Sequence, residues 1–247
     1  MAYKNLWTNS TPADPCTVTI APAANDFLIG WAIADSTSGA DSVPSGWTQT
    51  FRGTSTFDGA ALLVGYKLAD GTETSAAFNS TGSNTMIAGV MSFDSVDTTT
   101  PLDVTPVTFS SSTGSTTTSM SITPVTNGCD IVFVQCQDNG NSDYTFTFST
   151  TSGTTGAWTT RADQRSGFFN VGAGSAVQTT AGALTAQCVS TSGGRIGVLY
   201  AIRPSGGGGG GATRGMPFGN RGTAFNGGRT FSGIIRRAML NMELKNA

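Results

Sequence analysis

Apolar and polar residues alternate in short segments throughout residues 1–203, and clusters of Gly, Ser, Asn and Asp separate these segments. In residues 144–148 every second residue is aromatic, which places the three rings on one face of an extended strand. The pattern predicts strands at residues 17–20, 26–34, 46–54, 59–68, 74–78, 85–93, 107–109, 119–122, 130–137, 144–148, 158–164, 172–179, 184–189 and 195–202. Their number and spacing indicate an all-β fold, an antiparallel β-sandwich or jelly-roll-like arrangement.

Three stretches recur in the same order in the two halves of this region, at offsets of about 102 to 111 residues. Residues 18–35 resemble residues 120–138, residues 45–52 resemble residues 156–161, and residues 87–93 resemble residues 196–202. The matches indicate an internal duplication with halves at about residues 16–103 and 119–203. The sequence allows two arrangements of the halves: two tandem sandwiches, or the two sheets of one larger sandwich. We expect the second arrangement, because no Pro- or Gly-rich linker separates the halves.

The composition changes abruptly after residue 203. Residues 204–211 form a linker that ends in six consecutive glycines, which favour a flexible or extended chain. Residues 212–247 then form an extended arm in which glycines separate single Phe and Arg residues, and residues 234–244 show the spacing of a short amphipathic helix. The expected partner-binding residues of the arm are Arg214, Met216, Phe218, Arg221, Phe225, Arg229, Phe231, Ile234, Ile235, Arg236, Arg237, Met239 and Leu240.

The two parts of the chain differ in charge. Only 11% of the residues are charged and the net charge is −2, but residues 1–203 carry seven basic and fourteen acidic side chains. Residues 204–247 carry six basic side chains and a single acidic one, Glu243. An acidic body with a basic arm indicates docking of the arm on an acidic surface of another protein. Six positive charges in this length are too sparse to predict a nucleic-acid partner.

The composition excludes several kinds of chemistry. The chain has 39 Thr and 33 Gly but no His, which excludes Ser-His-Asp and Cys-His catalysis and every metal site that needs imidazole. The four cysteines are scattered, so we expect small buried side chains and neither a zinc site nor a cofactor; they are Cys16, Cys129, Cys136 and Cys188. No window approaches the ~18 apolar residues of a membrane span, and the N-terminal residues lack the apolar region of a signal peptide.

Two further groups of residues invite a functional interpretation. Asp94, Asp97 and Asp103 surround Pro101, and paired carboxylates can hydrolyse glycosides or bind calcium. We favour the simpler interpretation, in which Asp and Thr side chains shape a turn through local hydrogen bonds. Residues 138–143 resemble a calcium loop in composition only, and their Asn-Gly pair is typical of a hairpin.

Tryptophan residues can form platforms for sugar rings. Trp47 and Trp158 occupy equivalent places in the two halves, which favours a role in packing the sandwich. For Trp7 and Trp31 we likewise favour packing over an exposed platform.

Four ordered motifs resemble a β-sandwich module of tailed-bacteriophage virion proteins. They are a Pro-x-Gly-Trp-Thr turn within residues 43–48, a Tyr-x-Lys strand within residues 63–73, a corner ending at Asp103 and a closing Ala-x-Arg-Pro strand within residues 197–204. The resemblance covers about residues 16–204, although Phe93-Asp94 replaces the Tyr-Arg usual in that module. It implies a structural role, because such modules occur in capsid decoration proteins and tail fibres, and it carries no catalytic motif.

These observations together predict a structural virion protein and not an enzyme. We expect a capsid decoration or cement protein, made in the host cytoplasm, whose arm anchors it to other virion proteins, and a homo-oligomer around a symmetric site. The alternative is a tail or head fibre component that presents the sandwich to host-surface glycans. Neither a membrane nor nucleic acid is an expected partner.

Overall fold

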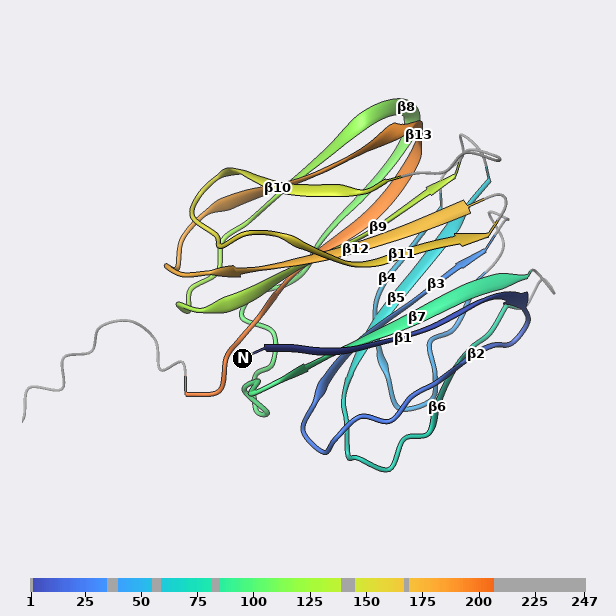
Figure 1. Cartoon of the computed structure of the whole chain (residues 1–247), viewed down its shortest axis with the longest axis horizontal. Coiled ribbons are helices and arrows are strands. Elements are labelled where there is room, and N and C mark those ends of the chain that lie inside the picture. Colours follow the sequence, from blue (N-terminus) through green and yellow to red (C-terminus); the bar gives the residue numbers. More distant parts are fainter. Residues whose placement is uncertain are drawn as a thin grey trace, which may run out of the picture. The chain divides into compact units, whose positions relative to one another are not determined.

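The computed structural model describes residues 2–34, 40–54, 59–80, 85–138, 145–166 and 169–206. These residues form antiparallel β-sheets, which confirms the predicted fold class (Figure 1). The first half contains β1 (Ala2–Ala13), β2 (Cys16–Thr19), β3 (Phe27–Ala34), β4 (Thr48–Thr54), β5 (Ala61–Leu68), β6 (Ser75–Phe78) and β7 (Met86–Asp94). The second half contains β8 (Val107–Ile122), β9 (Cys129–Asp138), β10 (Thr147–Ser152), β11 (Thr159–Ser166), β12 (Phe169–Gln178) and β13 (Leu184–Ile202).

The strands lie close to their predicted positions, with three differences. β1 was not predicted, because its polar run at residues 8–11 hides the alternation. β8 and β13 are each continuous where two short strands were expected. β10 begins at Thr147, three residues later than predicted, but Phe146 and Phe148 are both buried, so the expected aromatic face is present.

The two halves have the same strand order, which confirms the internal duplication. The first sheet has the order β1-β7-β3-β5-β4, and in the second half the order β8-β13-β9-β12-β11 repeats it. β2 pairs with β6 in a separate two-stranded sheet. The second half reproduces this pair between residues 117–122 of β8 and residues 184–189 of β13, where β10 adds a further strand.

The irregularities of the sheets are duplicated as well. β4 shifts its register against β5 between Gln49 and Phe51, and β11 shifts its register against β12 between Thr160 and Ala162. Each register shift begins two residues after a tryptophan, and the two shifts occupy equivalent places in their sheets. A β-bulge that recurs at one position in both halves is a specific feature, because bulges are local interruptions of the pairing.

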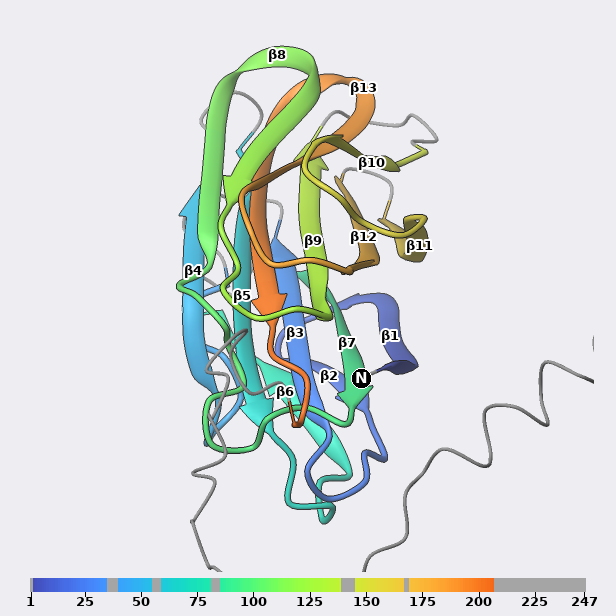
Figure 2. The ribbon, with the colours of Figure 1, turned by 90° about the vertical axis from the view of Figure 1, so that its left-hand side faces the viewer.

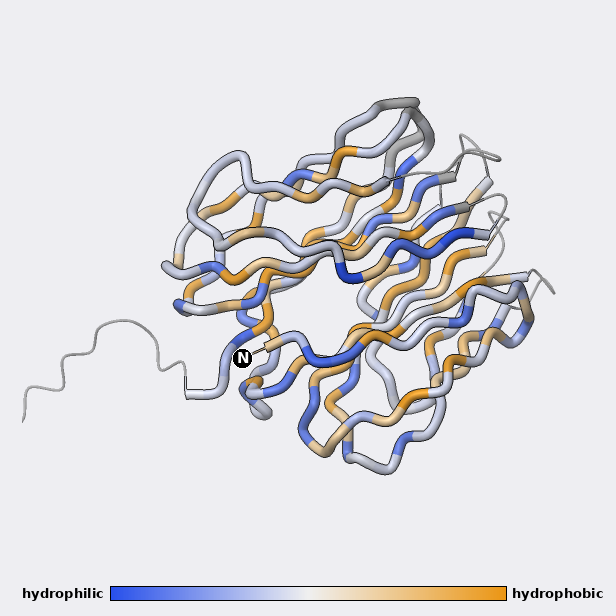
Figure 3. Tube along the Cα trace, in the orientation of Figure 1, coloured by the Kyte–Doolittle hydropathy of each residue, from blue (hydrophilic) through white to orange (hydrophobic). Residues whose placement is uncertain are grey.

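The two large sheets pack face to face through equivalent faces. The central core joins Ile29, Trp31 and Ile33 of β3 to Val132 and Val134 of β9, which are the corresponding strands of the two halves. The edges meet reciprocally, since β1 contacts β11 and β4 contacts β8. Hydrophobic residues follow the strands of both sheets, whereas β1 and β11 carry hydrophilic segments (Figure 3). The expected arrangement, two sheets of one larger sandwich, is therefore confirmed, with a pseudo-twofold relation between the sheets.

Each large sheet also has an outer layer of its own. β2 and β6 cover the outer face of the first sheet over a core that includes Val18, Leu28 and Phe78. In the second half β8 and β13 bend over together at one end, so that their outer segments cover their own sheet (Figure 2). The core beneath them includes Met120 and Leu199. Each half thus adds a smaller layer to the common central core.

Candidate functional site

The partner-binding residues expected in the arm, from Arg214 to Leu240, lie outside the described residues, as do the predicted helix and residues 207–211 of the glycine run. By its internal contacts the chain divides into one unit over Met1–Gly211 and another over Ala212–Ala247. The described part therefore shows the point where the chain leaves the sandwich towards the arm. An anchoring arm would transmit its load at this exit.

The exit is bonded to the corner that connects the two halves. The Ser205 N–H donates to the Ser95 carbonyl over 2.7 Å, the Arg203 N–H donates to the Pro101 carbonyl over 2.9 Å, and the Asp97 N–H donates to the Arg203 carbonyl over 3.0 Å. We call residues 95–103 together with residues 202–205 the exit clip. The chain leaves this clip at residue 206, where the glycine run begins.

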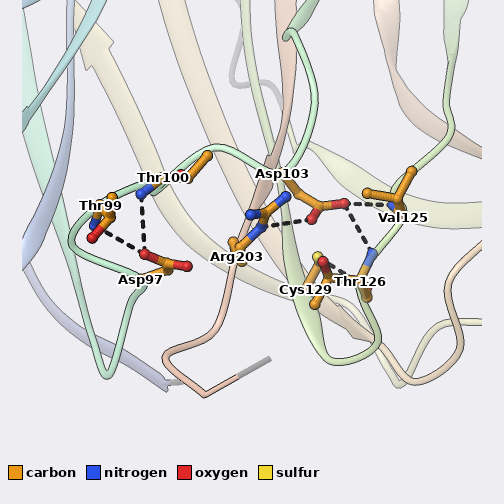
Figure 4. A network of polar contacts seen from close by, with 8 residues as sticks. All are labelled: Asp97, Thr99, Thr100, Asp103, Val125, Thr126, Cys129 and Arg203. Atoms are coloured by element: carbon orange, nitrogen blue, oxygen red, sulfur yellow. Dashed lines mark hydrogen bonds and ion pairs between the residues drawn. The ribbon is translucent and has the colours of Figure 1, made fainter. Parts of the chain in front are cut away.

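An ion pair lies at the centre of the exit clip (Figure 4). Arg203 Nε donates to Asp103 Oδ1 over 3.0 Å, and the Asp103 side chain is fully buried whereas that of Arg203 is 23% exposed. Asp103 Oδ2 accepts the backbone N–H groups of Val125 and Thr126. Burial acts to raise the pKa of Asp103, but the hydrogen bonds from Thr126, Val125 and Arg203 outweigh it and lower the pKa. Asp103 is therefore ionised and fixes both the exit and the loop between β8 and β9.

Asp97 shapes the turn of the corner. Its Oδ1 atom accepts the N–H groups of Thr99 over 2.9 Å and Thr100 over 3.0 Å, and these bonds from Thr100 and Thr99 lower its pKa (Figure 4). For Asp97 the preferred interpretation, a turn built by Asp and Thr through local hydrogen bonds, is confirmed. Asp94 and Asp103 instead bind groups far away in the sequence.

The three aspartates expected around Pro101 bind different groups. Asp94 Oδ1 accepts the N–H of Ala2 over 3.2 Å, whereas Asp97 and Asp103 bind the residues given above. Within the described ranges, no group of three or more His, Cys, Asp or Glu side chains is arranged to bind a metal ion. Of residues 138–143, which resemble a calcium loop in composition, residues 139–143 fall outside these ranges.

All four cysteines are buried, as predicted for small core side chains. Burial raises the pKa of Cys16 to about 11 and the pKa values of Cys129 and Cys188 to about 12. These thiols are neutral at physiological pH, and a neutral thiol is a poor nucleophile and metal ligand.

The tryptophans pack as expected. Trp31 is fully buried in the central core. Trp47 packs edge-on against Phe78 with ring centroids 6.3 Å apart, and Trp158 stacks on Phe148 at 5.9 Å. Trp7 is partly buried against the outer core of the first half. The described structure therefore uses these rings for packing.

Polar contacts also join the two sheets. Trp31 Nε1 donates to Gln164 Oε1 over 2.8 Å, and Gln164 Nε2 donates to the Ala88 carbonyl over 2.9 Å. At the same edge, the Arg161 guanidinium lies 4.2 Å from the centre of the Tyr3 ring, in a cation–π contact. Sequence reasoning did not single out Gln164. Ala162 and Gln164 are the two buried residues of β11, and a polar side chain at the second of these positions interrupts the apolar alternation that would mark an inward face.

Asp130 is a further buried carboxylate that sequence reasoning missed. It is 3% exposed, and its Oδ2 atom has no hydrogen-bond partner. Burial raises its pKa to about 6. Asp130 pairs with Ile202 at the position where Phe27 pairs with Phe93 in the first half. The signal that could have identified it is this replacement of an aromatic residue by an acid in the duplicated strand.

Comparisons with known proteins give no relative. No protein-family model, no curated protein and no solved structure matches the chain. In the part of the chain that the structure describes, no helix has the length and apolar character needed to cross a membrane.

Proposed function

We propose that the chain is a structural virion protein of a tailed bacteriophage, a capsid decoration or cement protein anchored through residues 212–247. The fold and the four ordered motifs support the virion module, and the charge difference supports an arm that docks on an acidic shell. The observation that carries the proposal is the exit clip, because it reinforces the one place where an anchoring arm would pull on the sandwich.

The geometry of the exit clip suits a mechanical load. Residues 202–205 run alongside residues 95–103, with antiparallel bridges between Val96 and Pro204 and between Leu102 and Ile202. Hydrogen bonds between such segments lie across the chain direction, so a pull along the chain loads several of them at once. The buried Asp103–Arg203 pair adds a charge-assisted bond to this set.

The arm supplies the binding chemistry in this proposal. Its Phe, Met and Ile side chains enter pockets on neighbouring virion proteins, and its arginines pair with carboxylates there. A single short arm binds weakly, so we propose that several copies assemble around a symmetric site and gain avidity. The site of action is the virion, and the partners are shell proteins and sister copies of this chain.

Truncation tests the proposal. Deletion of residues 206–247 leaves every described strand in place, and we expect a folded protein that is lost from purified particles. A matched variant keeps the full length and replaces Phe218, Phe225 and Phe231 by Ser. It should also lose occupancy if the aromatic anchors bind. Unchanged occupancy of the truncated protein on particles contradicts the proposal.

The alternative, a tail or head fibre component that binds host glycans, makes a different prediction about copy number. A decoration protein is present in many copies over the shell, whereas a fibre is present in few copies at one vertex. The packing roles of Trp31, Trp47 and Trp158 favour decoration, because these rings are engaged inside the sandwich. Quantitative mass spectrometry of particles separates the two, and glycan binding by residues 1–203 would support the fibre.

A further inference from the structure

A polar cluster lies in the outer core of the second half, where the first half is apolar. Arg195 is 1% exposed, and Gln135 and Gln137 are fully buried. Arg195 pairs with Gln137 between β13 and β9 as Met86 pairs with Ala34 between β7 and β3. The residues at the equivalent positions of the first half are Met86, Ala32 and Ala34, all fully buried. The duplication thus provides an internal reference in which the same place is filled by apolar side chains.

The Arg195 guanidinium lacks part of the hydrogen bonding that a buried charged group needs. Its Nη1 atom donates to Thr118 Oγ1 over 3.0 Å, whereas its Nε–H has no partner. None of the ion pairs among the described residues includes Arg195. Burial lowers the pKa of Arg195, and a Cys188 thiolate would be the negative charge that opposes this shift. The Cys188 thiol is neutral, since burial raises its pKa to about 12. A buried guanidinium without a counter-charge is costly in free energy.

The two glutamines beside Arg195 leave acceptors unused. Gln135 Nε2 donates to Ser190 Oγ over 3.4 Å, and Gln137 Nε2 donates to the Thr191 carbonyl. The Oε1 atoms of both glutamines are buried and have no partner. The cluster therefore holds one unused charged donor and two unused acceptors on the same outer-core face of the paired strands β13 and β9.

We infer that this cluster binds a small oxyanion that also carries a hydroxyl group, of the hydrogen phosphate or bicarbonate type. An anionic oxygen accepts the Nε–H of Arg195 and compensates its charge. The hydroxyl group donates to the Oε1 atom of Gln135 or Gln137, which a chloride or a fully ionised sulfate cannot do. The site occurs in the second half alone, because Met86, Ala32 and Ala34 offer no such groups.

Thermal unfolding of the full chain at constant ionic strength tests the inference. Hydrogen phosphate and bicarbonate are titrated separately, and the larger response identifies the ligand. At about one hundred times the Kd we expect Tm to rise by roughly 5 °C. Sulfate and chloride should give clearly smaller shifts. If the Tm responds to neither hydrogen phosphate nor bicarbonate, the inference is overturned and water is the occupant of the cluster. If sulfate raises the Tm equally, the proposed role of the amide oxygens as acceptors is contradicted.

The first half provides the matched substitutions. Arg195→Met introduces the residue of the equivalent position, and we expect this variant to fold and to lose the anion response. Arg165→Met removes a partly exposed arginine of β11 and should keep the response. Gln137→Ala, which copies Ala34, should weaken binding about tenfold. A response that survives in Arg195→Met contradicts the site.

A crystallographic measurement is independent of stability. Arsenate is isosteric with phosphate, carries a hydroxyl group and gives an anomalous signal. We expect an arsenic peak within hydrogen-bond distance of Arg195 Nε in crystals of the full chain grown with arsenate. Absence of a peak at this place, with arsenate at saturating concentration, overturns the inference.

Discussion

Trp31 of β3 donates its indole N–H to Gln164 of β11 over 2.8 Å, and both side chains are buried between the two sheets. A Cβ atom at Gly89 would overlap the Trp31 ring and lie 2.7 Å from Gln164 Oε1. Gly89 therefore makes room for this contact. The bond joins residues of different halves, so it reports on the packing of one half against the other.

Gln164→Ala should destabilise the protein by about 2–3 kcal/mol, because the substitution leaves the buried indole N–H of Trp31 without its partner and removes the bond to the Ala88 carbonyl. Urea unfolding followed by tryptophan fluorescence measures the change. Gln187→Ala is the control, since Gln187 bonds to Ser119 at the surface, and it should stay within ~0.5 kcal/mol of the wild type. Equal stability of the two variants would contradict a role for Gln164 in joining the halves.

Asp103→Ala should destabilise the exit clip by about 3 kcal/mol, because it removes a buried carboxylate from the Arg203 guanidinium and from two backbone N–H groups. Chemical denaturation of Asp103→Ala, Arg203→Ala and the double variant measures the coupling between them. Asp97→Ala removes an exposed turn carboxylate instead and should cost much less. Additive effects of the two clip substitutions would refute the ion pair.

Asp130 should make the protein less stable as the pH rises from about 4 to 6. Its pKa of about 6 in the folded state lies above the ordinary value of 3.8, so the folded state binds the proton more tightly. This contribution is complete below the ordinary pKa and is lost as the pH rises through the folded pKa, by at most ~3 kcal/mol. Asp130→Asn should remove this slope and be the more stable protein at pH 7.

Unfolding curves from pH 4 to pH 7 measure that difference. Asp103 contributes with the opposite sign, because its pKa is lowered and its stabilisation is lost only in more acidic solution. The difference between wild type and Asp130→Asn isolates Asp130 from such groups. A difference that does not change with pH in this interval would show that Asp130 is not the titrating group.

Gly174→Ala should destabilise the second half by about 1–3 kcal/mol, since the new Cβ atom would overlap the Phe148 ring. Gly156→Ala is the matched control. The nearest atom to its Cβ would be the Val177 carbonyl oxygen at 3.7 Å, so this substitution should be neutral or slightly stabilising. Thermal unfolding compares the two variants, and a Gly174→Ala protein as stable as Gly156→Ala would contradict the close packing.

Much of the fold could be predicted from local patterns of apolar and polar residues in the sequence. Strands buried on both faces contain continuous apolar runs, as over β3 and at residues 131–134 of β9, and both strands were predicted to within one residue. The repeat of the Trp47 turn at Trp158 indicates the duplication from the amino-acid sequence alone. β1 was not predicted because it is largely polar and its adjacent apolar residues Leu6 and Trp7 face opposite sides, Leu6 towards the central core and Trp7 towards the outer core of the first half.

The candidate sites were less predictable, because they depend on contacts between residues far apart in the chain. Asp103 was identified as a turn carboxylate, yet its pairing with Arg203 follows from the meeting of two segments a hundred residues apart. Arg195 lies within a predicted strand, and its burial follows only once β8 and β13 fold back over the sheet. An alignment of the two halves could have identified Arg195, because it places this arginine at the position of Met86.

The reciprocal contacts between the sheets have an evolutionary consequence. β1 meets β11 through Tyr3 and Arg161, and β4 meets β8 through the Thr54 carbonyl and Ser110 Oγ. A surface that packs against its own counterpart is the kind found in twofold-symmetric dimers. The arrangement is therefore the one expected if a twofold homodimer of half-length chains was joined into one chain by gene fusion. In that case the polar cluster around Arg195, which has apolar residues at its equivalent positions in the first half, arose after the two copies could diverge.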